Sequence, residues 1–171
     1  MPESINTDYS IDNIIYKNGF HKKLCILNPN LITLIGFIIS LFAAFLFYKN
    51  NNKYIFFIIL LVILRALADI YDGMIARKCK KTSKLGKYLD LLSDNIFIFI
   101  FLLLTYYKID SQYIKYIIYI CMLFIIRCCY NCLFTNYDVI YNYKIMTFIH
   151  DNIIIFTPLY VYFCHLIVNN F

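Results

Sequence analysis

Long apolar runs, separated by short polar connections, dominate the chain. The first run, Leu31–Tyr48, carries no charge. A polar turn at 49–53 separates it from a second run that starts at Tyr54 and continues into Asp69. An α-helix needs about 20 mainly apolar residues to cross the hydrocarbon core of a bilayer. The pattern therefore predicts two consecutive membrane-spanning helices.

Three further apolar segments follow a basic connection at 77–84. They cover Leu85–Tyr107, Tyr113–Phe134 and Ile145–Val168. These runs are long and unbroken, whereas the strands of a transmembrane β-barrel alternate over segments of about ten residues. We therefore predict an all-α fold, a polytopic membrane helical bundle with about five or six transmembrane helices.

The first 27 residues differ from the rest because they are polar to amphipathic, and Asn28-Pro29-Asn30 separates them from the first apolar run. Apolar side chains on one side of this segment favour a short helix lying at the membrane interface. We predict two regions, an N-terminal polar or interfacial segment at 1–27 and a membrane-embedded domain at 28–171.

The composition supports the membrane class. Hydrophobic residues make up 62% of the chain and charged residues 15%, against about 45–50% and about 25% in soluble domains. The chain is too apolar to be disordered, and a soluble domain of this length could not bury so much apolar surface. Membrane lipids are therefore its expected surroundings.

The net charge of +6 is concentrated in one polar connection. Its cations are Arg77, Lys78, Lys80, Lys81, Lys84 and Lys87. A basic cluster between apolar runs is typical of a cytoplasmic loop, and no soluble domain accompanies it to form a nucleic-acid surface. We expect an integral multi-pass membrane protein with this loop inside and no nucleic-acid partner.

Six of the seven cysteines lie in or beside apolar segments. Cysteines in helices usually behave as small hydrophobic residues, and the spacing shows no secreted disulfide framework. Cys129 and Cys132 form a C-x-x-C pair without the further ligands that a zinc site needs. We therefore expect the helical cysteines to act as small hydrophobic residues.

Four aspartates lie where two apolar helices meet the basic connection. At about 100° per residue, Asp69, Asp72, Gly73 and Ala76 share one face of the first of these helices. Charges at membrane depth are costly and indicate functional sites. The two small residues leave room for a ligand to approach the backbone.

On the next helix, Gly86, Asp90 and Asp94 are spaced four residues apart and also share a face. The short connection makes the two helices antiparallel neighbours, so the four carboxylates are expected to converge at the cytoplasmic end of a groove. Unpaired carboxylates repel strongly at low dielectric, and such hard oxygen ligands suit Mg²⁺ or Mn²⁺. We predict a site for one or two of these ions.

The complete pattern resembles the signature of the class I CDP-alcohol phosphatidyltransferase family. It reads Asp69-x-x-Asp72-Gly73-x-x-Ala76-Arg77, eight residues, then Gly86-x-x-x-Asp90-x-x-x-Asp94. Members of the family make phospholipids inside membranes: a CDP-linked donor gives its phosphoryl-bearing part to an alcohol, and CMP leaves. The resemblance covers about 28–107 well and the remainder loosely.

The resemblance implies a role for each position. Asp69, Asp72 and Asp90 would bind the metal, and Asp94 would be the general base that takes the proton of the acceptor hydroxyl. Binding of the CDP donor would fall to Gly73, Ala76, Arg77 and Gly86. Phosphoryl transfer suits such a site, because it depends on charge neutralisation and positioning more than on covalent help. Family members commonly form homodimers, which we also expect here.

Three polar residues elsewhere in the apolar segments are candidates for further roles. Arg65 either pairs with an aspartate or reaches a substrate phosphate. Arg127 and His150 are candidate acceptor-binding residues. The alternatives are a membrane-edge role for Arg127 and a polar core position for His150.

The sequence leaves the substrates open. We favour transfer of a phosphatidyl group from CDP-diacylglycerol to an alcohol. The alternative within the family is a CDP-choline or CDP-ethanolamine phosphotransferase acting on diacylglycerol. Outside it, a non-catalytic membrane protein that binds divalent cations, or a scaffold that has lost activity, would carry similar carboxylates. Their clustering at one membrane side, with no acidic relay beyond, argues against a cation path.

Overall fold

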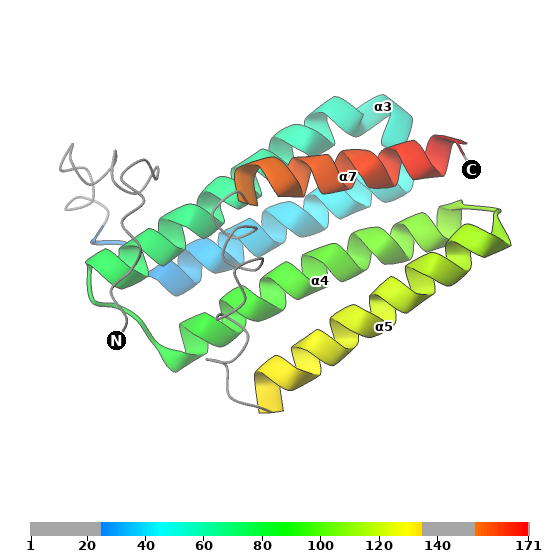
Figure 1. The fold of residues 1–171 in the computed structure, drawn as a ribbon. Coiled ribbons are helices and arrows are strands. Elements are labelled where there is room, and N and C mark those ends of the chain that lie inside the picture. The colour runs from blue at the N-terminus through cyan, green and yellow to red at the C-terminus, as the bar shows by residue number, and fades with distance from the viewer. Residues whose placement is uncertain (1–24, 135–152, 171) are drawn as a thin grey trace.

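The computed structural model describes residues 25–134 and 153–170, and no strand occurs among them. The helices are α3 (Pro29–Lys78), α4 (Lys84–Lys108), α5 (Gln112–Phe134) and α7 (Ile153–Asn170). They run side by side in a bundle (Figure 1). The predicted all-α fold is therefore confirmed. Most of the predicted interfacial segment at 1–27 lies outside the described residues.

Helix α3 consists of two helices joined at a kink. Asn50 leaves the helical region (φ −163°, ψ 94°), and its side-chain oxygen accepts a hydrogen bond from the Lys53 N–H at 3.0 Å. The chain reverses here, so that the two parts of α3 fold back alongside one another (Figure 1). This kink is the polar turn predicted at 49–53.

Within the described residues, three helices are long and apolar enough to cross a membrane, namely Pro29–Asn50, Asn52–Lys78 and Lys84–Lys108. Large apolar side chains on the outside agree with lipid surroundings: Phe56 is 83% exposed and Phe124 63% exposed. A soluble protein rarely exposes so much contiguous apolar surface. Helices α5 and α7 occupy the fourth and fifth predicted segments, and the total of five or six spans stays a prediction.

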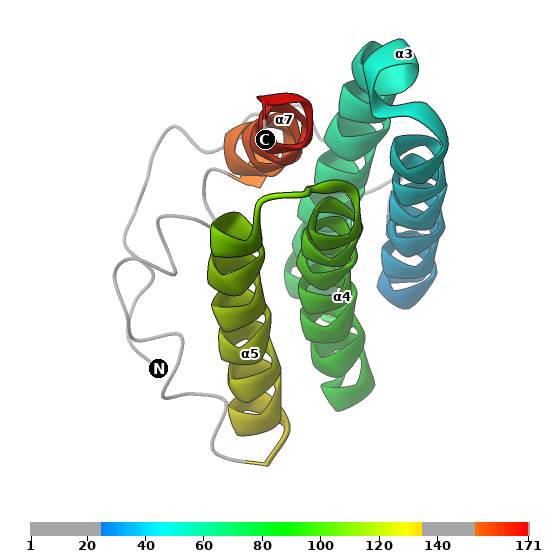
Figure 2. The same cartoon turned by 90° about the vertical axis from the view of Figure 1, so that its right-hand side faces the viewer.

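Helix α4 lies at the centre of the bundle. It packs against α3, α5 and α7, and Figure 2 shows it between α3 and α5. The core between α3 and α4 contains a row of aromatic rings, with centroids of Phe47 and Phe101 5.3 Å apart and those of Phe97 and Phe101 5.1 Å apart. Because this packing fixes α4 against α3, it also fixes the carboxylates that the two helices carry.

Side-chain caps determine where the two helices begin. The Asn28 oxygen accepts a hydrogen bond from the Asn30 N–H at 3.1 Å before α3. The Ser83 hydroxyl accepts one from the Gly86 N–H at 2.9 Å before α4. Each cap satisfies a donor that the first helical turn leaves unpaired. Residues of both helix starts line one cavity.

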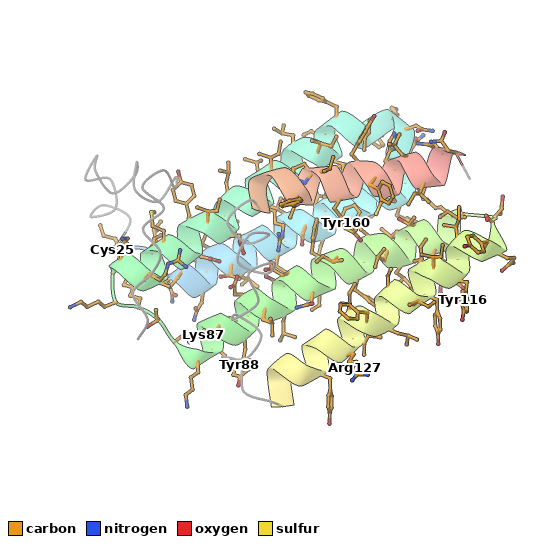
Figure 3. The ribbon with its side chains drawn as sticks, viewed as in Figure 1. Cys25, Lys87, Tyr88, Tyr116, Arg127 and Tyr160 are labelled. Atoms are coloured by element: carbon orange, nitrogen blue, oxygen red, sulfur yellow. A yellow bond between two sulfur atoms is a disulfide. The ribbon has the colours of Figure 1, made fainter. Side chains whose placement is uncertain are left out.

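Cys25 and Cys79 form a disulfide with Cα atoms 5.6 Å apart. Cys25, labelled in Figure 3, precedes α3, and Cys79 follows it. The expectation that the spacing holds no disulfide was therefore wrong for this pair. Among the described residues Cys164 is free and buried, as expected of a small hydrophobic residue, whereas Cys121 is free but exposed. The bond depends on the reversal of α3, which brings together residues 54 positions apart.

Candidate metal and donor-binding site

Three aspartates from α3 and α4 converge near the ends of the two helices. One carboxylate oxygen each from Asp69, Asp72 and Asp90 lies within 4.8 Å of the others. Asp72 is buried, and the Oδ2 atom of Asp69 is buried without a hydrogen-bond partner. Buried polar atoms are nearly always paired. An orphaned carboxylate oxygen beside two more carboxylates therefore fits a divalent cation.

The first part of α3 also contributes to this cluster through Thr33. The buried Thr33 hydroxyl donates to Asp72 and lies 3.2 Å from the carbonyl oxygen of Pro29. Hydrogen bonds of this kind orient a carboxylate for metal binding. The cluster and its hydrogen-bond partner thus come from three helical segments, since Thr33 and Asp72 lie on the two parts of α3 and Asp90 lies on α4.

Asp94 lies one helical turn beyond Asp90 and has a different partner. Its Oδ1 atom accepts a hydrogen bond from Arg65, and the pair forms a salt bridge. The side chain of Arg65 is 4% exposed and that of Asp94 is 32% exposed. Of the two roles considered for Arg65, pairing with an aspartate is the one observed. Asp94 does not belong to the three-carboxylate cluster.

A cavity of about 300 Å³ opens beside the carboxylates. It is lined by Pro29, Asn30, Thr33, Asp72, Gly73, Ala76, Arg77, Lys81, Thr82, Ser83, Gly86, Lys87 and Asp90. Basic side chains therefore line the same cavity as two members of the carboxylate cluster. Guanidinium and ammonium groups bind phosphate oxygens, while carboxylates bind the cations that accompany phosphates. The cavity therefore offers both kinds of group that bind a nucleoside diphosphate, cations for its phosphates and carboxylates for the accompanying metal ion.

The two glycines of the signature allow close approaches around this cavity. A Cβ atom on Gly73 would lie 3.0 Å from Nη1 of Arg77, and one on Gly86 would lie 2.7 Å from Oδ1 of Asn30. The absence of a side chain at Gly73 lets the Arg77 guanidinium lie against the helix. At Gly86 it lets the start of α4 approach the start of α3.

Lys81, in the connection between α3 and α4, binds the segment that precedes α3. Its Nζ donates to the carbonyl oxygens of Cys25 and Leu27, at 2.6 and 3.0 Å. The preceding residue, Lys80, has a left-handed backbone conformation (φ 55°). Together with the disulfide, these bonds hold 25–27 beside the cavity that Lys81 lines.

The structure brings most predicted site residues together. Asp69, Asp72 and Asp90 cluster, and Gly73, Ala76, Arg77 and Gly86 line the adjoining cavity. Arg127 is exposed on α5, as Figure 3 shows, and is not among the cavity-lining residues. His150 lies outside the described residues.

The first part of α3 contributes Asn30 and Thr33 to the cavity lining, and neither residue was predicted to belong to the site. A signal was present, because Asn30, Thr33 and Gly36 are polar or small and recur every third residue along an otherwise apolar run. Lys81 and Lys87 were interpreted only as loop charges, although both line the cavity.

Sequence comparisons relate the chain to known proteins. A sequence model described as CDP-alcohol phosphatidyltransferase matches residues 26–168. An archaetidylinositol phosphate synthase of Pyrococcus horikoshii is 41% identical over 70 residues, which cover 41% of this chain and 36% of that protein. A CDP-diacylglycerol–glycerol-3-phosphate 3-phosphatidyltransferase of Aquifex aeolicus is 34% identical over 95 residues, covering 56% and 51%.

A second protein with that transferase name, from Wigglesworthia glossinidia brevipalpis, is 37% identical over 76 residues, which cover 44% of this chain and 42% of the relative. The chain thus spans about half or less of the length of the curated relatives it matches. No solved structure matches the chain.

Proposed function

The chain belongs to the CDP-alcohol phosphatidyltransferase family, and we propose that it is a metal-dependent enzyme of phospholipid synthesis. It transfers a phosphatidyl group from CDP-diacylglycerol to the hydroxyl of an alcohol and releases CMP. The observation that carries the proposal is the cluster of Asp69, Asp72 and Asp90 beside a cavity that Arg77 also lines.

CDP-diacylglycerol is the donor favoured here over CDP-choline or CDP-ethanolamine. Two relatives carry CDP-diacylglycerol in their names, together with glycerol 3-phosphate. The third is named for archaetidylinositol phosphate. We therefore place phosphorylated alcohols first among the acceptors to be tested, with Arg127 and His150 as candidate acceptor contacts.

In this proposal Asp69, Asp72 and Asp90 would hold one or two Mg²⁺ or Mn²⁺ ions. A bound divalent cation supplies charge neutralisation at the donor pyrophosphate and at the leaving CMP. Arg77 contacts donor phosphate oxygens, and the small residues Gly73, Ala76 and Gly86 leave space for the nucleotide against the helices.

Asp94 acts as the general base. Its Oδ1 atom is held by Arg65, so Oδ2 is the atom assigned to the acceptor hydroxyl. The acceptor oxygen forms a bond to the phosphorus that carries the diacylglycerol group. The bond from that phosphorus to the CMP oxygen breaks, and the acceptor proton passes to Asp94. A base must lie within hydrogen-bond reach of the proton that it takes.

Two further properties belong to the same proposal. The site faces the cytoplasm, because the connection between α3 and α4 carries the basic residues that favour the inner side of a membrane. The enzyme acts as a homodimer within the lipid bilayer, as family membership suggests.

The test is CMP release by purified protein in mixed lipid–detergent micelles with Mg²⁺ or Mn²⁺. One series offers CDP-diacylglycerol with glycerol 3-phosphate, inositol phosphate, inositol or serine. A second offers CDP-choline or CDP-ethanolamine with diacylglycerol. EDTA should abolish CMP release in the productive series. Asp94→Asn should reduce it at least 100-fold, since general bases contribute about 10²–10⁴ in rate.

The matched control is Asp110→Asn, which makes the same change at an exposed aspartate between α4 and α5 and should leave the rate unchanged. CMP release only in the second series would replace the proposed donor. A protein that binds Mn²⁺ but neither binds nor cleaves a CDP-linked donor would contradict the proposal and favour a non-catalytic cation-binding protein.

A further inference from the structure

Two sets of bonds join the segment before α3 to the connection that follows it. The first is the disulfide between Cys25 and Cys79, whose Cα atoms lie 5.6 Å apart. The second is formed by the ammonium group of Lys81, which donates to the carbonyl oxygens of Cys25 and Leu27 at 2.6 and 3.0 Å. Figure 3 shows Cys25 at the same end of the bundle as Lys87, a residue of the cavity lining. Both sets of bonds therefore lie at the cavity end of the bundle.

These bonds link two walls of the cavity. The start of α3 supplies Pro29, Asn30 and Thr33 to the lining, and the connection between α3 and α4 supplies residues 81–83. The bonded residues are close neighbours of both walls in the sequence. Their bonds therefore limit how far the start of α3 and the connection can move relative to each other.

Side-chain burial contributes little to holding the segment before α3. Ile26 is 86% exposed and Leu27 is 44% exposed, so little of their apolar surface is buried within the protein. In the connection, the N–H of Lys81 donates to the carbonyl oxygen of Ala76 at 2.9 Å. This bond ties the backbone of Lys81 to the end of α3, while its ammonium group reaches the segment. The disulfide and Lys81 therefore supply the restraint that burial does not.

The disulfide is open to reduction. Both cysteines are only half-buried, and thiol–disulfide exchange depends on access to the sulfur atoms. The basic connection is expected on the cytoplasmic side, where disulfides are usually transient or redox-sensing. With a dithiol as reductant, the S–S bond of the protein breaks and takes up two electrons and two protons, which gives two thiols. The dithiol loses the same electrons and protons and becomes a cyclic disulfide.

We propose that the Cys25–Cys79 disulfide and Lys81 form a redox-sensitive clamp on the donor cavity. This inference rests on the proposed function. In the oxidised protein the clamp holds the two walls in place before the donor arrives. Reduction leaves Lys81 as the remaining part of the clamp, and the donor binds more weakly because its binding must then order the walls.

The experiment measures kcat and the KM for CDP-diacylglycerol in the CMP-release assay, before and after reduction with dithiothreitol. For the unsubstituted protein we expect the KM to rise about tenfold on reduction, as is typical of coupled sites, with kcat within about twofold. Reoxidation should restore the original KM. The variant Cys25→Ser/Cys79→Ser should have the raised KM with and without reductant. Cys121→Ser, the same change at a free, exposed cysteine of α5, should respond as the unsubstituted protein does.

Lys81→Met tests the second part of the clamp. It should raise the KM about threefold in the oxidised protein but at least about tenfold in the reduced protein, because contacts that support one another do not add independently. Lys84→Met is the matched control. It removes an equal charge at the first residue of α4, which is not among the cavity-lining residues, and should leave the KM unchanged in both states.

Labelling by a maleimide, followed by mass spectrometry, gives a readout besides activity. Cys25 and Cys79 should be labelled only after reduction. Four outcomes would overturn the inference: labelling of both cysteines without reductant, an unchanged KM in the reduced protein, an irreversible loss of kcat on reduction, or an equal effect of Lys81→Met in the two states. The last result would mean that Lys81 contacts the donor directly and not through the clamp.

If Cys25→Ser/Cys79→Ser does not fold, reversible reduction of the unsubstituted protein decides the same question. Failure of the proposed function is distinguishable from failure of the clamp. In the first case the oxidised, unsubstituted protein releases no CMP with any donor. In the second it releases CMP with a KM that reductant does not change.

Discussion

Replacing Thr33 by valine removes one hydroxyl group from the site while nearly preserving side-chain volume. This hydroxyl donates to the buried carboxylate of Asp72. A hydrogen bond to a charged group contributes about 1.5–3 kcal/mol, and each 1.4 kcal/mol corresponds to about a factor of ten in affinity. We therefore expect Thr33→Val to weaken Mn²⁺ binding by about 10–100-fold.

The assay is the Mn²⁺ concentration that gives half-maximal CMP release, together with the rise in melting temperature that Mn²⁺ produces. Thr33→Ser keeps the hydroxyl and should restore most of the affinity. Thr105→Val is the matched control, because Thr105 is also buried but donates to the Phe101 carbonyl of its own helix at 2.7 Å. Its Mn²⁺ dependence should be unchanged.

Two results would refute this reasoning. One is a Thr33→Val protein whose Mn²⁺ dependence and melting temperature both match those of the unsubstituted protein. The other is an equal loss of Mn²⁺ affinity in Thr105→Val. The second result would mean that any lost buried hydroxyl disturbs the bundle, rather than that Thr33 orients Asp72.

Gly86→Ala places a Cβ atom 2.7 Å from Oδ1 of Asn30. Overpacking costs about 1–3 kcal/mol, so the KM for the donor should rise about tenfold. Adding Asn30→Ala should restore the original KM, and a KM that stays high would count against this contact. In the native protein Cys25 and Cys79 should resist maleimide until a reductant is added. Their replacement by serine should lower unfolding free energy by up to about 4 kcal/mol, and no loss would contradict a formed bond. Tyr160→Phe removes the hydrogen bond to the Ile98 carbonyl at 2.8 Å and should cost about 1 kcal/mol in thermal unfolding, with CMP release unchanged; altered release would link α7 to catalysis.

The helices could be predicted from local pattern because membrane spans are local in character. An apolar run must satisfy its own backbone hydrogen bonds in lipid, so its length in the sequence determines its length as a helix. The predicted segment Leu85–Tyr107 therefore corresponds to α4 at Lys84–Lys108, and Tyr113–Phe134 to α5 at Gln112–Phe134. The turn at 49–53 followed equally from its polar residues.

Helical periodicity also grouped three of the four carboxylates that were expected to converge. Spacings of three and four residues place side chains on one helix face whatever the helix packs against. The short connection between α3 and α4 then leaves few ways to arrange the two faces. The clustering of Asp69, Asp72 and Asp90 could therefore be predicted from the sequence.

Tertiary structure alone decided which residues complete the site across the bundle. Three contacts join residues at least 29 positions apart: the hydrogen bond from Thr33 to Asp72, the salt bridge between Arg65 and Asp94, and the disulfide between Cys25 and Cys79. Such pairs depend on the rotation and depth of packed helices, which side-chain volumes across the interface determine. The sequence alone determined the helices and the faces that carry the chemistry, whereas packing determined which partner each charged group received.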